Sequence, residues 1–338
     1  MPESNRNAKS SNSKRITLVI LCLILVAVIT IGLTRAAIKT IESSVRAEYG
    51  ASLNAVMNTT EAALRFWTEQ RKSELLRLSE NEIVQSITLN LKEAFENQEA
   101  RNLAAYREST AVYLNSLDAL QTKTEYHLIS SEGKYLYSSR PLFNSQESAI
   151  ARTSPRLFQD ALQGKAAFIP PMKIKTGPST FETFVFFIAP IIFEEKVIGV
   201  IASSHNPEDK ISQIMSLGRI GESGESYIIN EQGLLVSLSR FKETLINLDK
   251  IADSESEILA VQLTVPSKDA PANTQLTEMA KSITQFESSQ NLGGYVGYRG
   301  TQVIGTWKWL PELHLGIATE ISFAEANLPF KKAKNTII

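Results

Sequence analysis

The strongest hydrophobic pattern in the chain is an uninterrupted apolar run near its N-terminus. Residues 16–34 read ITLVILCLILVAVITIGLT and contain no charged side chain. A helix rises about 1.5 Å per residue, so this run is just long enough to cross a hydrocarbon core of roughly 30 Å. A cleaved signal would have a shorter apolar region and would place small residues where Arg35 stands. We therefore predict an uncleaved transmembrane helix.

The charges on either side of this run indicate its orientation. Residues 1–15 hold four Lys and Arg side chains, and residues 35–49 hold three. The excess of positive charge favours a cytoplasmic tail over residues 1–15, with the rest of the chain outside the membrane.

A second pattern, with helical spacing, follows the membrane run. From residue 36 to about Leu91 the sequence has no proline and a single glycine, Gly50. Apolar residues recur at steps of three and four, which predicts one long helix within a stalk region at 36–118. They are Ile38, Ile41, Val45, Tyr49, Leu53, Val56, Leu64, Trp67, Leu75 and Leu78. Either a sheet of the same chain or the same helix of a second subunit could cover this stripe, and the two are compatible.

The remaining sequence contains one pattern twice. At 126–140 an apolar strand meets a polar turn that ends at Gly133, and a second strand ends at Arg140. At 227–240 the same layout turns at Gly233 and ends at Arg240. Glycine tolerates the positive φ that closes a tight turn, so each copy predicts a hairpin.

The second half of each copy also matches. Residues 183–202 and 301–319 both read as strand, polar turn and strand. Helical stretches are expected between and after the hairpins, at 154–164, 207–215, 276–287 and 323–330. Hairpin, helix, hairpin is typical of a small antiparallel sheet with helices packed on it, so the predicted class is α+β with two tandem modules.

These segments resemble the double Cache sensor domains of bacterial transmembrane receptors. Residues 221–237, GESGESYIINEQGLLVS, are similar to the opening of that family's membrane-proximal module, and residues 297–321 are similar to its closing hairpin. The resemblance implies a membrane-distal PAS-like module at 119–215 and a membrane-proximal one at 216–330. It also implies that 331–338 begins a second, truncated transmembrane helix.

In that family the distal module usually holds the ligand, between its sheet and the loops that cover the open face. The strand around 184–189 has no polar side, so one side can pack on the long helix and the other needs a cover or a small molecule. We take seven residues of this module as candidate ligand contacts: Tyr135, Tyr137, Arg140, Phe184, Phe186, Ser203 and His205. The simpler reading makes the phenylalanines plain core and Arg140 a turn residue, because Arg240 occupies its place in the other copy.

The amino-acid-binding members of the family carry an Arg-x-Trp-Tyr element and an aspartate on the last distal strand. The corresponding stretches here, 166–172 (AAFIPPM) and 200–205 (VIASSH), lack both. This argues against the usual clamp on an α-amino acid. Another anion paired with Arg140 stays open, because guanidinium binds carboxylates in a bidentate manner.

Composition excludes several other classes. The 35 basic and 36 acidic side chains nearly cancel, so nothing indicates a nucleic-acid partner. Cys22 is alone, which excludes a disulfide framework, and the three histidines form no metal-binding motif. No phosphate-binding loop or nucleophile motif occurs. We therefore expect no catalytic residues, no metal and no cofactor.

Together these features predict the periplasmic sensory part of a bacterial inner-membrane receptor. Its expected partners are an unidentified small molecule, the lipid bilayer and a second copy of the chain through the stalk. The expected output module, a histidine kinase or a diguanylate cyclase, is not within these residues. The alternative is a membrane-tethered binding or assembly protein without signalling output.

Overall fold

The computed structural model describes residues 4–117, 124–177, 179–266 and 275–337. It divides into two units. Residues 53–323 form the larger unit, which contains both sheets, and the other unit comprises residues 1–52 and 324–338. Within the described residues, one helix is long and apolar enough to cross a membrane, which is consistent with the predicted anchor.

Helix α1 spans Ser4–Ser79, and α2 (Glu82–Glu96) and α3 (Ala100–Ser116) follow it. The predicted long helix is confirmed, and it ends at Ser79, directly after the last apolar residue of the predicted stripe, Leu78. Asn81 accepts a hydrogen bond from the amide of Ile83 at 2.9 Å and so caps a new helix. Val84 and Leu91 of α2 are buried, like the apolar residues of α1.

The distal sheet has five antiparallel strands in the order β2-β1-β5-β4-β3. A 3₁₀ turn (Pro141–Phe143) and the short helices α4 (Ala149–Thr153) and α5 (Pro155–Leu162) connect β2 to β3. The strands are β1 (Glu125–Ser130), β2 (Tyr135–Ser138), β3 (Ala167–Lys175), β4 (Phe181–Phe193) and β5 (Lys196–His205).

The proximal sheet has four antiparallel strands in the order β6-β9-β8-β7. The strand expected after Gly233 is not part of it, because Leu234 and Leu235 make only isolated bridges. The strands are β6 (Glu225–Ile229), β7 (Ser289–Val296), β8 (Gln302–Leu310) and β9 (Leu315–Ser322). The helices after β5 are α6 (Lys210–Ser216), α7 (Lys242–Asn247), α8 (Glu278–Thr284), α9 (Phe323–Ala326) and α10 (Leu328–Ile337).

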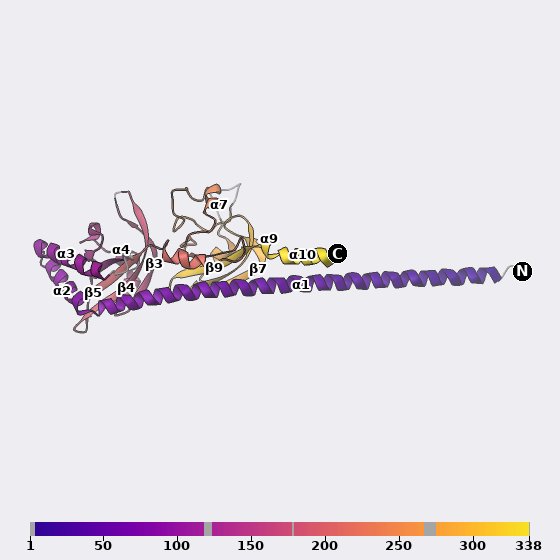
Figure 1. Ribbon diagram of the computed structural model, residues 1–338, viewed down its shortest axis with the longest axis horizontal. Coiled ribbons are helices and arrows are strands. Elements are labelled where there is room, and N and C mark those ends of the chain that lie inside the picture. Colours follow the sequence, from indigo (N-terminus) through magenta and orange to yellow (C-terminus); the bar gives the residue numbers. More distant parts are fainter. Residues whose placement is uncertain (1–3, 118–123, 178, 267–274, 338) are drawn as a thin grey trace. The chain divides into compact units, whose positions relative to one another are not determined.

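The C-terminal part of α1 runs along both sheets (Figure 1). One continuous core joins Leu64 and Trp67 of α1 to strand residues of the distal module, such as Phe187, and of the proximal module, such as Ile317. The other face of each sheet packs in a core of its own. Each sheet is therefore buried on both sides, and α1 is the element that the two modules share.

Candidate functional site

The open face of the distal sheet carries a cavity of about 500 Å³. A volume of this order is typical of small-molecule sites. Strand β2, the loop after it, α4 and the end of β3 supply its walls. The lining residues are Tyr135, Leu142, Phe143, Gln146, Glu147, Ala149, Arg152, Ile174, Lys175 and Gly177.

The inner part of this cavity is aromatic and apolar. The rings of Tyr135 and Phe143 stack with centroids 5.7 Å apart, and Ile174 and Ala149 are also buried. The Tyr135 side chain is almost fully buried, and no described residue makes a hydrogen bond of good geometry with its hydroxyl oxygen. Burial raises the pKa of this hydroxyl, so it is neutral at neutral pH.

The outer part of the cavity carries two cations. Arg152 stands on α4 and Lys175 at the end of β3, and both side chains are exposed. Neither forms an ion pair with a residue that the structure describes. The cavity also has one acid, Glu147, so its lining carries a net positive charge. Such a lining favours an anionic ligand over a cationic one.

The loop over the cavity is held in place from two sides. Arg107 of α3 donates to the carbonyl of Leu136 at 2.7 Å and to the Ser145 hydroxyl at 2.9 Å. The backbone of the loop also pairs with β2, because Tyr135 exchanges hydrogen bonds with Ser145 and Gln146. The wall that carries Phe143 is therefore fixed before any ligand arrives, which reduces the entropy cost of binding.

The tight turn before β2 requires its glycine. Gly133 has a φ of +80°, and a Cβ there would come within 2.8 Å of the Ala151 side chain in α4. The predicted hairpin is confirmed, and this close approach brings α4 against the sheet beside the cavity.

The seven predicted contacts do not share one face of the sheet. Tyr135, Phe184 and Phe186 belong to the core beneath the open face, and only Tyr135 lines the cavity. Tyr137 belongs to the core that includes α1. Ser203 and His205 line a small crevice with Arg71 and Leu75 of α1. Strand residues alternate between faces, and the sequence does not say which alternate set faces the ligand.

Arg140 lies outside the cavity lining and binds two carboxylates of its own chain. Its Nε donates to Glu125 at 2.9 Å, and its two terminal nitrogens donate to Glu182 at 2.9 and 3.0 Å. The guanidinium also lies 4.8 Å from the ring centre of Phe184. Burial lowers its pKa, but the hydrogen bonds to both carboxylates outweigh this effect and raise the pKa.

Arg240, its counterpart in the other copy, donates to the carbonyls of Gly221 and Gly224. Both arginines therefore join the end of a hairpin segment to a neighbouring strand or turn.

Sequence reasoning missed Arg152, Lys175, Phe143 and Ile174. Arg152 stands on a helix of five residues, and Lys175 is the last residue of a strand that contains Pro170 and Pro171. Neither segment shows a strong periodic pattern, since prolines demote a strand prediction. The resemblance to the family was the one feature of the sequence that indicated this region, because it implied a ligand between the distal sheet and the loops that cover it.

A family model for the Cache domain matches residues 38–329, most of the chain. Cache domains are ligand-binding sensor domains rather than catalytic ones. The chain therefore belongs to the double Cache family, as the sequence resemblance indicated. A search of curated protein sequences finds no match.

Solved structures with a similar fold include sensor domains of two kinds of receptor. The sensor domain of the Vibrio cholerae histidine kinase DctB is 12% identical, with a TM-score of 0.48, and the match covers 83% of this chain and 98% of that one. The sensory domain of the Campylobacter jejuni chemoreceptor Tlp3 is 15% identical, with a TM-score of 0.49 and coverage of 84% and 98%. The ligand-binding domain of the Pseudomonas aeruginosa chemoreceptor PctB, in complex with L-Gln, is 14% identical, with a TM-score of 0.46 and coverage of 82% and 92%.

Proposed function

We propose that this chain is the extracytoplasmic sensory part of a bacterial membrane receptor and that it binds a small organic anion in the distal cavity. The observation that carries the proposal is that one cavity combines the buried Tyr135 with Arg152 and Lys175, which form no ion pair with any residue that the structure describes. A carboxylate would accept charge-assisted hydrogen bonds from these donors. The aromatic wall of Tyr135 and Phe143 would cover the apolar part of the ligand.

Amino acids are a second ligand class to be tested, because the PctB domain was solved with L-Gln. Glu147 is the acid in the cavity lining that could face an ammonium group. The aspartate and the Arg-x-Trp-Tyr element of the amino-acid-binding members are absent from β5 and β3. We therefore favour a carboxylate without an α-amino group.

The signal would leave the distal module through α1. Trp67 of α1 meets Phe187 of β4 edge to face, with ring centroids 5.3 Å apart. A ligand that binds one packing of this sheet better than another shifts the equilibrium between the two. Residues 16–34 would carry the change across the inner membrane, with the two modules in the periplasm. A paired stalk in a homodimer would pass it to a histidine kinase or diguanylate cyclase output module.

Thermal unfolding of the full chain in detergent tests the ligand assignment. A panel of mono- and dicarboxylates is compared with the corresponding amides and with amino acids. A ligand at about a hundredfold its Kd adds roughly 2.7 kcal/mol to the free energy of unfolding. We expect at least one carboxylate to raise the melting temperature and its amide to have no effect.

Two variants, Arg152→Gln and Lys175→Gln, should each remove most of that rise. Arg156→Gln is the matched control, because Arg156 is an exposed arginine of the next helix and does not line the cavity. A carboxylate whose effect persists in both cavity variants would contradict the assignment. A rise produced by amino acids alone would assign the cavity to the other ligand class.

A further inference from the structure

Two glutamates face each other in the interior of the proximal module. Glu225 of β6 and Glu320 of β9 are register partners in neighbouring antiparallel strands. Partners of this kind point to the same face, with Cβ atoms roughly 4.5–5.5 Å apart. Glu225 is 3% exposed and Glu320 1% exposed. Carboxylates are rarely buried so completely, and two in direct opposition need a specific account.

Tyrosine hydroxyls surround the pair. Tyr298 donates to Glu225 and Tyr295 donates to Glu320, each at 2.5 Å. The hydroxyl of Tyr227, also on β6, lies close enough to Glu320 to lower its pKa. These tyrosines are themselves buried, so water does not replace them as donors.

Among the residues that the structure describes, one largely buried cation, Arg299, stands beside the pair. Arg299 places Nε 3.6 Å from Glu225, and its guanidinium lies 3.7 Å from the ring centre of Phe241. Arg240 offers only its backbone amide to Glu225, since its side chain binds carbonyls. One buried cation therefore stands beside two buried carboxyl groups.

The other charged groups near the pair are at its margins. Arg219 is exposed and lines the cavity next to Glu225. Glu278 of α8 acts on Tyr295 and accepts hydrogen bonds from Asn291. On β8 the position opposite Glu320 is Gly305, which contributes no charge. Among these described residues, none is a second buried cation.

We propose that Glu225 and Glu320 together form a proton-binding site, so that the proximal module responds to the pH outside the cell. Two like charges this close inside a protein, with a single cation beside them, repel each other and raise the pH at which the second carboxyl group ionises. The pair therefore holds one proton at moderately acidic pH and releases it as the pH rises.

The electrostatics place this release in the physiological range. Burial, together with the charge of Glu225, raises the pKa of Glu320 to about 7, although hydrogen bonds from tyrosines act against the shift. Burial also raises the pKa of Glu225. Because the two groups interact, the midpoint belongs to the pair.

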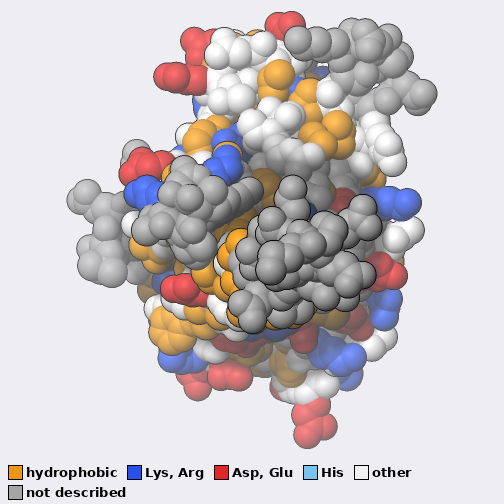
Figure 2. All heavy atoms as spheres, turned by 90° about the vertical axis from the view of Figure 1, so that its right-hand side faces the viewer, with side chains coloured by type: hydrophobic (Ala, Val, Ile, Leu, Met, Phe, Trp, Pro, Cys, Tyr) orange, Lys and Arg blue, Asp and Glu red, His pale blue; other side chains and the backbone are white. Residues whose placement is uncertain are grey.

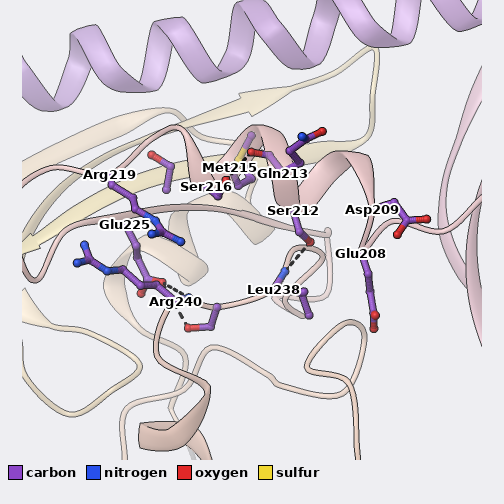
Figure 3. Close-up of a pocket in the computed structure, with 12 residues that line it drawn as sticks. Glu208, Asp209, Ser212, Gln213, Met215, Ser216, Arg219, Glu225, Leu238 and Arg240 are labelled. Carbon is purple, nitrogen blue, oxygen red and sulfur yellow. Dashed lines mark hydrogen bonds between the residues drawn. The ribbon is translucent and has the colours of Figure 1, made fainter.

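A cavity of about 350 Å³ gives the proton a route to solvent. Glu225, Ser239, Arg240 and the exposed Arg219 line it, and Figure 3 shows Glu225 between the side chains of Arg219 and Arg240. Exchange with water therefore does not require the module to unfold.

The site also connects to α1. Ser226, the neighbour of Glu225, donates to the carbonyl of Gly218 and lies 2.7 Å from the Thr319 hydroxyl. A Cβ on Gly218 would come within 2.5 Å of the Ser226 Cβ and 2.8 Å of the Thr60 methyl group in α1. Because this packing leaves no space, a displacement of β6 on ionisation would move α1.

Infrared spectroscopy of the full chain in detergent tests the proposal. At pH 5.5 most carboxylates are ionised, so a protonated carboxyl group gives a separate band. We expect the wild type to show one such band, half lost near pH 7 and absent at pH 8.5. A wild-type spectrum without a band that disappears in this range overturns the proposal.

Variants assign the band. Glu320→Gln should abolish it, and Glu225→Gln should move its midpoint to lower pH, because this change removes the like charge but not the burial of Glu320. Glu231→Gln, an exposed glutamate of the turn after β6, should retain it. Tyr295→Phe removes a donor to the ionised form and should move the midpoint upward by about one pH unit. A band unchanged in all three site variants belongs to another group and overturns the proposal.

Discussion

Single polar residues in the distal module can be buried because other polar side chains satisfy their hydrogen bonds. His127 is 1% exposed, and its two ring nitrogens lie 2.9 Å from the Ser138 hydroxyl and 3.1 Å from the Ser204 hydroxyl. Ser204 also donates to Glu125, which accepts from Arg140. Each member of this network is satisfied by the next, so the polar atoms do not weaken the core as isolated ones would.

His127 should remain neutral far below the usual range. Burial, assisted by the positive charge of Arg140, lowers its pKa from 6.5 to about 3. Its contribution to stability is therefore present above pH 6.5 and is lost as the pH falls toward 3. Nitrogen chemical shifts of the His127 ring should not move between pH 8 and pH 5. The same protein in urea is the control, where the ring should titrate near 6.5. A folded-state midpoint near 6.5 would contradict this account.

At the scale of elements, the two sides of α1 differ sharply although their residues are adjacent. Trp67 is 7% exposed and packs on Phe187 and His205, whereas Phe66 is 73% exposed. The stripe that the spacing predicted is thus the buried side from Leu53 to Leu75. An aromatic residue on the opposite side, such as Phe66, is available to a second subunit, as the sequence left open.

Substitution of these two neighbours separates packing from helix propensity. Trp67→Ala should lower the free energy of unfolding by about 3–5 kcal/mol, because it opens a cavity between α1 and the distal sheet. Phe66→Ala should change it by less than about 0.5 kcal/mol in the monomer. Denaturant titration followed by circular dichroism measures both. Similar losses for the two variants would show that the buried face is not where the structure places it.

At the scale of the whole molecule, α1 also joins the proximal module by charge. Lys308 of β8 donates to both carboxylate oxygens of Glu61 in α1, at 3.0 and 2.9 Å, and Arg65 donates to Glu61 at 2.8 Å. Burial would raise the pKa of Glu61, but these hydrogen bonds outweigh it and lower the pKa. On the face of the molecule that Figure 2 shows, acidic and basic side chains are interspersed.

Removal of Lys308 should loosen the proximal module from α1. Lys308→Met leaves Glu61 with Arg65 alone and should cost about 1–2 kcal/mol, less than a fully buried pair, because the lysine side chain is 41% exposed. Calorimetry should show a proximal transition that separates from the distal one. The difference in the free energy of unfolding between this variant and the wild type should shrink as the pH falls below 4.5, because Glu61 then takes up a proton. The double variant Glu61→Gln, Lys308→Met should recover part of the loss, and no recovery would argue against this pairing.

Much of this architecture was predictable because its signals are local. Each of these patterns can be recognised from residues close together in the sequence. They are the apolar run at 16–34, the periodic residues of α1, and the turn glycines Gly133 and Gly233. The strands β3 and β7 were missed because prolines and glycines interrupt their patterns, at Pro170, Pro171, Gly293 and Gly294.

The sequence by itself determined the class of the protein: a long helix that begins as an apolar span, followed by one hairpin unit repeated twice. Only the tertiary structure decided which alternate residues of each strand face the cavity, and that Arg152 and Lys175 come together there. It alone also placed Glu225 opposite Glu320, which are separated by 95 positions in the chain. The reason is that faces and registers are fixed by packing against elements distant in sequence, which no local pattern encodes.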